Sequence, residues 1–149
     1  MEYEKIFKIL AFYSAFIGLL YFYFGLIQWL IFLKVLKNNL HFSADLMSGF
    51  TLLVIGGIYV SGVKRLLDGE IKGLSYPLVA TILSLGVALL FLLILVANSI
   101  EYYVIGNEDY AGWTIIQDIR PELFLAPLSM PIIYLLWKLI IKEKLVKPI

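Results

Sequence analysis

The chain has 149 residues, 62% of them hydrophobic, with a mean hydropathy of +0.93 and a net charge of +1. A soluble domain of this length is closer to half apolar, so the composition indicates an integral membrane protein with the lipid bilayer as a partner. The small net charge excludes a polybasic nucleic-acid surface, and the lack of cysteine excludes disulfides, thiol redox chemistry and cysteine-ligated metals. The single histidine, His41, excludes a multi-histidine metal or haem site within one chain, and we expect no cofactor.

Four apolar segments follow along the chain, and each approaches or exceeds the roughly 20 residues that a membrane-spanning helix needs. The first, Ile9–Leu33, runs for 25 residues without a charged side chain. The others are Leu46–Val63, Gly73–Ile100 and Leu123–Ile141, the last interrupted only by Lys138, whose ammonium can snorkel to the headgroups. The sequence therefore predicts an all-α, polytopic fold with four transmembrane helices in a bundle, a single domain of residues 1–149 with spans over about 9–33, 46–67, 75–100 and 122–141.

The distribution of basic residues predicts the orientation. Nine of the twelve lysines and arginines lie before the first span, at the junction of the second and third spans, or at and beyond the end of the fourth, where Lys138 is included. Lys34, Lys37 and Arg120 lie on the opposite side, so the positive-inside rule places both termini in the cytoplasm and the protein in the cell membrane. The first span is too long for the apolar core of a signal peptide, and no small-residue cleavage site follows it, so we expect it to be retained.

The first two loops carry signals for where the helices begin and end. In the first loop, Ser43 is a candidate N-cap for the second span, with Asp45 in the first turn of that helix. In the second loop, Gly69 suits the left-handed position after a helix, and Ser75 with Pro77 suits the start of the third span.

The third loop, about Asn98–Arg120, is the longest and is predicted to face outward. Within it, Trp113–Ile119 is predicted to lie as a short segment in the outer membrane interface, anchored by its tryptophan. Pro121 then suits the first residue of the fourth span. Two further prolines in that span predict a kink near Ala126–Met130.

Small residues predict where the helices touch, because lipid gives no hydrophobic drive for helix association and close approach must come from small side chains. Each of the first three spans carries such a series: Ala11, Ala15, Gly18 and Gly25; Gly49, Gly56, Gly57 and Ser61; and Ala80, Ser84 and Ala88. Close helix packing is the favoured interpretation, and a substrate route is the alternative. We expect Gly57→Leu or Ser84→Leu to loosen the bundle.

Few residues are suited to ligand binding. The central thirds of the spans lack Asp, Glu, Lys, Arg and His, which argues against proton-coupled or ion-coupled transport by the chain alone. The candidate ligand-lining residues are Gln28 in the first span and Asn98, Glu101 and Tyr102, which share a helical face at the outer mouth of the third. The hydroxyls within the spans are expected to bond to the carbonyl of the preceding turn: Thr51, Thr81, Ser84 and Ser129.

Two pairs of residues are candidates for acid–base chemistry at the outer surface. His41 and Asp45 are four apart, so the carboxylate could orient the imidazole if they shared a helical face. Asp118 and Glu122 form the second pair. The acidic residues Glu101, Glu108, Asp109, Asp118 and Glu122 could bind a hard cation, since such ions take several oxygen ligands. A solvated outer face is the favoured interpretation, because their spacing matches no calcium-binding loop, and we expect no metal site. For Glu122, a position at the N-terminus of the fourth span, where a negative charge is stabilised, is a further interpretation.

No motif in the chain identifies an activity, and three functions stay open. The first is a non-catalytic small subunit or scaffold that acts through helix association with other membrane protein chains or with itself. The second is a small oligomeric transporter, channel or ligand-binding component, suggested by the glycines of the second span and the prolines of the fourth. The third is a membrane enzyme acting on a lipid-like substrate. We rank them in this order.

Overall fold

The computed structural model describes the backbone of residues 2–35 and 45–146, and the side chains of residues 4–35 and 45–141. Within these ranges the chain forms helices joined by turns, with no strand. The long helices are α1 (Glu2–Phe32), α2 (Leu46–Ser61), α4 (Ser75–Ile100) and α6 (Pro121–Val146). The short ones are α3 (Val63–Leu67), the 3-10 helices η1 (Ile71–Leu74) and η3 (Glu108–Tyr110), the π-helix η2 (Glu101–Ile105), and α5 (Ile115–Asp118).

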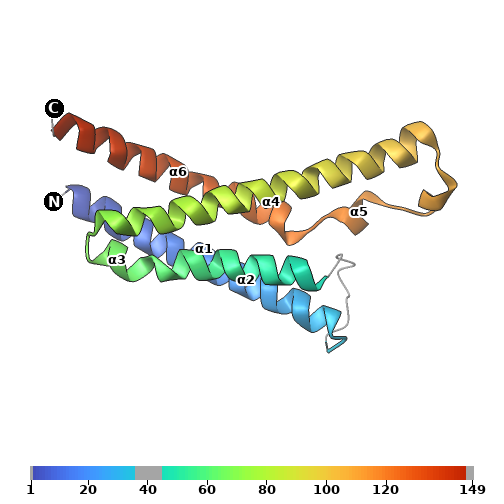
Figure 1. The fold of residues 1–149 in the computed structure, drawn as a ribbon, viewed down its shortest axis with the longest axis horizontal. Helices are drawn as coiled ribbons and strands as arrows, with labels where there is room; N and C mark the ends of the chain where they lie inside the picture. Colours follow the sequence, from blue (N-terminus) through green and yellow to red (C-terminus); the bar gives the residue numbers. More distant parts are fainter. Residues whose placement is uncertain (1, 36–44, 147–149) are drawn as a thin grey trace.

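The four long helices form a bundle in which α1 packs against α2 and α4 packs against α6 (Figure 1). The start of α1 and the end of α6 lie at the same end of the bundle, here called the termini end; the opposite end is called the far end. Four segments are long and apolar enough to cross a membrane: Glu4–Phe32, Leu46–Leu67, Ile71–Ile105 and Pro121–Ile141. The predicted four-helix transmembrane fold is therefore confirmed.

The helices extend beyond the apolar segments that predicted them. α1 starts at Glu2 because the glutamates and lysines before Ile9 are themselves good helix formers. α2 and α3 are separated by Gly62, where a Cβ would lie 2.5 Å from the Cβ of Tyr76 at the start of α4. α4 runs directly into η2, so the third helical segment ends at Ile105 and not near residue 100.

Helix ends follow the local sequence with one exception. Asp45 is itself the N-cap of α2: its side chain accepts a hydrogen bond of 2.6 Å from the backbone N–H of Ser48. The prediction that Asp45 lies within the first turn is therefore wrong, and the predicted cap, Ser43, lies outside the described residues. Gly69 has a φ of +72° just after α3, and Pro121 begins α6, both as predicted.

Glycines form the contact between α1 and α2. A Cβ on Gly56 would lie 2.9 Å from the carbonyl oxygen of Gly18, and a Cβ on Gly25 would lie 3.0 Å from the carbonyl oxygen of Gly49. Only a residue without a side chain allows the two backbones to come this close. The prediction of a small-residue contact is confirmed for these four glycines and is wrong for Gly57, where the nearest atom to a Cβ would be 3.9 Å away.

The core of the bundle also contains paired hydroxyls. Tyr21 of α1 hydrogen-bonds to Ser84 of α4, and Tyr59 of α2 hydrogen-bonds to Thr81 of α4 at 2.8 Å. The rings of Tyr21 and Tyr59 pack with their centroids 5.8 Å apart. Ala80 and Ser84 are buried, as the small-residue series of the third span predicts. These contacts hold α4 against the α1–α2 pair in the half of α4 nearest the termini end.

Candidate functional site

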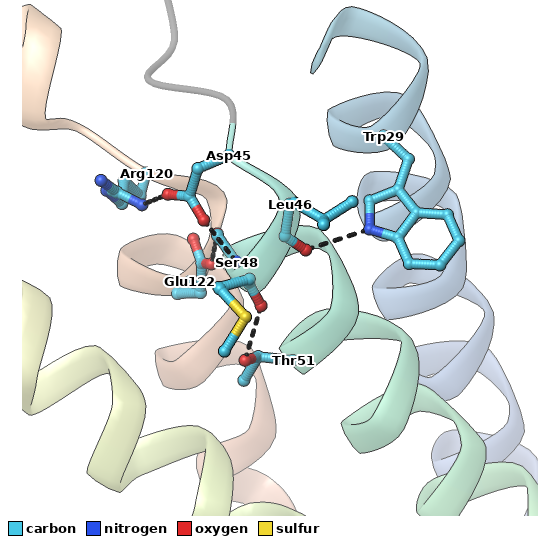
Figure 2. Close-up of polar contacts among 8 residues, drawn as sticks. Trp29, Asp45, Leu46, Ser48, Thr51, Arg120 and Glu122 are labelled. Carbon is cyan, nitrogen blue, oxygen red and sulfur yellow. Dashed lines mark hydrogen bonds and ion pairs between the residues drawn. The ribbon is translucent and has the colours of Figure 1, made fainter. Parts of the chain in front are cut away.

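The far end of the bundle carries a group of polar and charged side chains (Figure 2). Asp45 lies immediately before α2 and Ser48 lies in its first turn, while Arg120 and Glu122 flank the proline that begins α6. The first turns of α2 and α6 face each other here, because both helices begin at this end (Figure 2). We call Asp45, Ser48, Arg120 and Glu122 the far-end cluster.

Three contacts join the members of the far-end cluster. Arg120 forms an ion pair with Asp45, and the hydroxyl of Ser48 donates a hydrogen bond to Oε1 of Glu122. Asp45 also caps α2 by accepting the N–H of Ser48, so one carboxylate binds the starts of two helices. Hydrogen bonds with a charged partner are stronger than neutral ones, and these fix α2 relative to α6.

Glu122 is buried at this site. Its exposed fraction is 2%, and its second oxygen, Oε2, has no hydrogen-bond partner among the described residues. The prediction that Glu122 belongs to a solvated outer face is therefore wrong, because the sequence places it at a helix start but does not reveal that α2 covers that start. A buried carboxylate oxygen without a partner is energetically costly.

The other two long helices reach the same level of the bundle. The guanidinium carbon of Arg120 lies 4.4 Å from the ring centroid of Phe91 on α4, a cation–π distance. Trp29 of α1 donates a hydrogen bond of 3.1 Å from its indole nitrogen to the carbonyl oxygen of Leu46 on α2 (Figure 2). The far-end cluster therefore lies at a level where all four long helices are tied together.

Gln28 precedes Trp29 and is also buried, with an exposed fraction of 2%. Neither its amide oxygen nor its amide nitrogen has a hydrogen-bond partner among the described residues. Thr51 and Ser129 differ: their hydroxyls bond to carbonyl oxygens of the preceding turn at 2.9 and 2.6 Å, as predicted. Gln28 therefore has unused hydrogen-bonding capacity in the interior of the bundle.

A second polar group lies beyond the far-end cluster, between α4 and residues 106–120, here called the returning segment because it leads back to α6. The amide nitrogen of Asn98 donates a hydrogen bond of 2.7 Å to Asp118, which also accepts one of 2.9 Å from the indole of Trp113. The hydroxyl of Tyr110 donates to the amide oxygen of Asn98 at 3.3 Å. These bonds attach the returning segment to α4.

The other two residues of the predicted outer mouth do not join this group. Glu101 accepts a hydrogen bond of 3.3 Å from Asn107, and Tyr102 is exposed, with its ring 5.7 Å from that of Trp113. The four candidate ligand-lining residues are thus separated: Gln28 lies inside the bundle, and the other three contact the returning segment. Whether any of them contacts a ligand stays a prediction.

The predicted acid–base pairs are placed as follows. His41 lies outside the described residues, so its pairing with Asp45 stays a prediction. Asp118 and Glu122 bond to different partners, Asn98 and Ser48 respectively, and the described contacts do not bring them together. No group of three or more His, Cys, Asp or Glu side chains that could hold a metal ion occurs within the described part of the chain.

Sequence reasoning missed Ser48 and Arg120. Both had a local signal: Ser48 lies three residues after an aspartate, which is the spacing of an N-cap and the amide it caps. Arg120 is the single basic residue of an otherwise acidic loop. Neither signal could show that Ser48 would bond to Glu122 or that Arg120 would pair with Asp45, because each contact joins positions more than 70 residues apart.

The comparisons with known proteins agree with the membrane fold. The family model described as the MJ0565 integral membrane domain matches residues 5–139, which include nearly all of the four spanning segments. The uncharacterized protein MJ0565 of Methanocaldococcus jannaschii is 32% identical over 134 residues, covering 87% of this chain and 90% of that protein. No solved structure matches the chain. The chain is therefore a multi-pass integral membrane protein and belongs to the MJ0565 integral membrane domain family.

Proposed function

We propose that this protein is a non-catalytic membrane subunit or scaffold that acts by associating with another membrane protein chain. The observation that carries the proposal is the second half of α4, where the returning segment covers part of the helix and most of the apolar side chains stay exposed. The buried residues of α4 all lie within its first ten positions: Pro77, Ala80, Thr81 and Ser84. Beyond them α4 presents exposed leucines to its surroundings, for example Leu89 and Leu93, which are 56% and 57% exposed.

The level of the far-end cluster defines how far α4 projects. Arg120 contacts both Asp45 and Phe91, so α2 and α6 begin at about the level of Phe91. From Ser75 to Phe91, α4 rises about 24 Å at about 1.5 Å per residue, close to the thickness of the hydrocarbon layer. Residues 92–105 continue for about 20 Å beyond that level, and Figure 1 shows α4 extending past α2 at the far end. We call residues 92–105 the α4 extension.

Lipid is a poor candidate to cover the α4 extension. Placing the whole extension in hydrocarbon would draw Asp45, Arg120 and Glu122 about 20 Å into the membrane, and charged groups there are costly. Placing the far-end cluster at the membrane surface leaves the α4 extension outside the hydrocarbon with its apolar side chains exposed. An exposed apolar patch of this kind on a protein marks an interaction surface. A partner chain therefore explains the extension better than lipid does.

The experiment uses the absence of cysteine, since one introduced cysteine becomes the only thiol. We would label Val96→Cys, in the α4 extension, with a benzophenone maleimide and irradiate native membranes. The control is Phe12→Cys on α1, which is 71% exposed and lies in the part of the bundle that faces lipid. We expect a protein adduct at Val96 and none at Phe12. Its mass distinguishes another chain from a second copy, and equal labelling at both positions, or no protein adduct at Val96, contradicts the proposal.

The same proposal includes the orientation, with both termini in the cytoplasm of a cell-membrane protein. Its support is the excess of basic residues at the termini end, together with four spans that return the chain to one side. A membrane-impermeant maleimide applied to intact cells should label Glu108→Cys at the far end and leave Lys72→Cys unlabelled. The reverse pattern would invert the topology.

A small transporter or ligand-binding component is the second candidate. It is favoured by the series of buried polar side chains along the bundle interior: Ser14, Tyr21, Gln28, Ser48, Tyr59, Thr81, Ser84, Glu122 and Ser129. Most of these are paired with one another or with the backbone, which suits packing as well as transport. Solute flux into proteoliposomes that contain the purified protein would favour this candidate.

A further inference from the structure

Two buried side chains near the far end leave hydrogen-bonding groups unused. Gln28 and Glu122 are each 2% exposed, and Oε1 and Nε2 of the former and Oε2 of the latter have no partner among the described residues. Buried polar groups are almost always paired, because an unpaired one loses its hydration without compensation. If these two side chains lie close together, one bound partner can satisfy both.

The packing of α1 and α6 places them in the same layer. The rings of Phe24 and Phe124 pack with centroids 5.5 Å apart, and the two helices run in opposite directions. Gln28 follows Phe24 by four residues on the same helical face, while Glu122 precedes Phe124 by two, so both lie on the far-end side of this ring pair. Their levels along the bundle differ by only about 3 Å at the rise of an α-helix.

α2 supplies a third group at this level. Ser48 donates to Glu122 and precedes Gly49. A Cβ on Gly49 would lie 2.3 Å from the ring of Trp29 and 3.2 Å from the carbonyl oxygen of Gly25, two positions that lie on either side of Gln28 in α1. Ser48 is 3% exposed, so its hydroxyl lies in the interior as well. α1, α2 and α6 therefore each carry one buried polar side chain at this level of the bundle. No described hydrogen bond joins Gln28 directly to Glu122, so the unused atoms of the two side chains can take a common partner.

The charges of the described residues favour a cation as that group. The described charged neighbours of Glu122 are Arg120 and Asp45, and these two form an ion pair with each other. The three side chains together carry one excess negative charge when both carboxylates are ionised. An excess charge inside a protein is expensive unless an opposite charge accompanies it. One bound monovalent cation supplies that charge, whereas a divalent cation would reverse the excess.

We propose that Gln28, Ser48 and Glu122 bind one monovalent metal cation of the sodium type. The ligands are Oε2 of Glu122, Oε1 of Gln28 and the hydroxyl oxygen of Ser48, which keeps a free lone pair while it donates to Oε1 of Glu122. Hard cations prefer such oxygen ligands. A site for a divalent metal is disfavoured because no cluster of three or more His, Cys, Asp or Glu side chains occurs in the described ranges. This site goes beyond the proposed association and does not depend on it.

The test measures thermal unfolding of the purified full-length protein in detergent. Sodium chloride replaces choline chloride at constant ionic strength, so that general screening of charges stays the same. Because a ligand that binds the folded state stabilises it in proportion to the logarithm of its concentration, we expect the unfolding midpoint to rise with sodium. Equilibrium dialysis with radioactive sodium should show one ion per chain.

Two variants and one control make the test specific. Gln28→Met is close in volume and removes one ligand, and Glu122→Gln removes the charge; both should abolish the sodium-dependent shift and the retention of sodium. Glu108→Gln removes an exposed carboxylate of the returning segment and should respond as the wild type does. Helical circular dichroism and size-exclusion chromatography show whether each variant folds. If Glu122→Gln does not fold, the comparison of Gln28→Met with the wild type is sufficient.

Three results would overturn the proposal. One is a wild-type midpoint that is the same in sodium and choline, with no sodium retained. Another is a sodium response that survives in Gln28→Met. The third is stabilisation of the wild type by acid alone without any sodium response, which would assign the positive charge to a proton on Glu122.

Discussion

Substituting alanine at two adjacent glycines separates a backbone contact from a general effect of glycine. At Gly56 a Cβ would lie 2.9 Å from the carbonyl oxygen of Gly18 and 3.2 Å from the backbone nitrogen of Phe22, so α1 and α2 must move apart. Overpacking of this kind costs about 1–3 kcal/mol. At Gly57 the nearest atom is the ring of Phe22 at 3.9 Å, an ordinary contact. Both variants share a gain in helix propensity of up to about 1 kcal/mol, which therefore cancels in the comparison.

We expect Gly56→Ala to unfold about 1–3 kcal/mol more easily than Gly57→Ala, which should match or exceed the wild type. The assay is equilibrium unfolding in mixed micelles with an increasing fraction of sodium dodecyl sulfate, followed by helical circular dichroism. The reasoning is refuted if the two variants have the same free energy of unfolding, or if Gly57→Ala is the less stable of the two. A less stable Gly57→Ala would support the expectation from the sequence that Gly57 belongs to the small-residue contact between the helices.

Further predictions concern the core, the far-end cluster and the returning segment. Ser84→Leu should destabilise the same unfolding equilibrium by at least about 1–3 kcal/mol, because it overpacks the contact with Tyr21; wild-type stability would contradict the packing of α4. Asp45→Asn keeps an N-cap acceptor and loses the ion pair, whereas Asp45→Ala loses both. Asp45→Ala should therefore be less stable than Asp45→Asn by about 1 kcal/mol, and equal stability would rule out the cap. Asp118→Leu removes the acceptor shared by Asn98 and Trp113, so hydrogen exchange should speed up in residues 106–120 while α1 and α2 stay protected; unchanged exchange in that segment would contradict its attachment to α4.

The glycine contact shows how far a local pattern can predict a membrane fold. The spacing of small residues correctly selected Gly18, Gly25, Gly49 and Gly56, because close approach in lipid needs small side chains wherever two helices cross. The spacing could not exclude Gly57, since the rotation of α2 about its own axis decides which of two adjacent glycines faces α1. That rotation depends on every contact that α2 makes.

The far-end cluster and the second polar group around Asn98 show the opposite case. Asp45, Asp118 and Glu122 were selected from the sequence as surface acids, but their partners come from other helices: Arg120, Asn98 and Ser48. Burial of Glu122 follows from the position of α2 over the start of α6, and no local pattern encodes that position. The same holds for Gln28, whose depth in the first span was evident and whose unpaired amide was not.

The sequence by itself determined that the chain crosses a membrane four times, because a run of apolar residues long enough to span hydrocarbon is a local property. It also determined most helix ends, since Pro121 and Gly69 act within one turn of their own positions. The tertiary structure alone decided which polar side chains meet inside the bundle and how far α4 extends past its neighbours. Those features arise from pairing between helices distant in the chain, where packing outweighs any preference that a short segment carries.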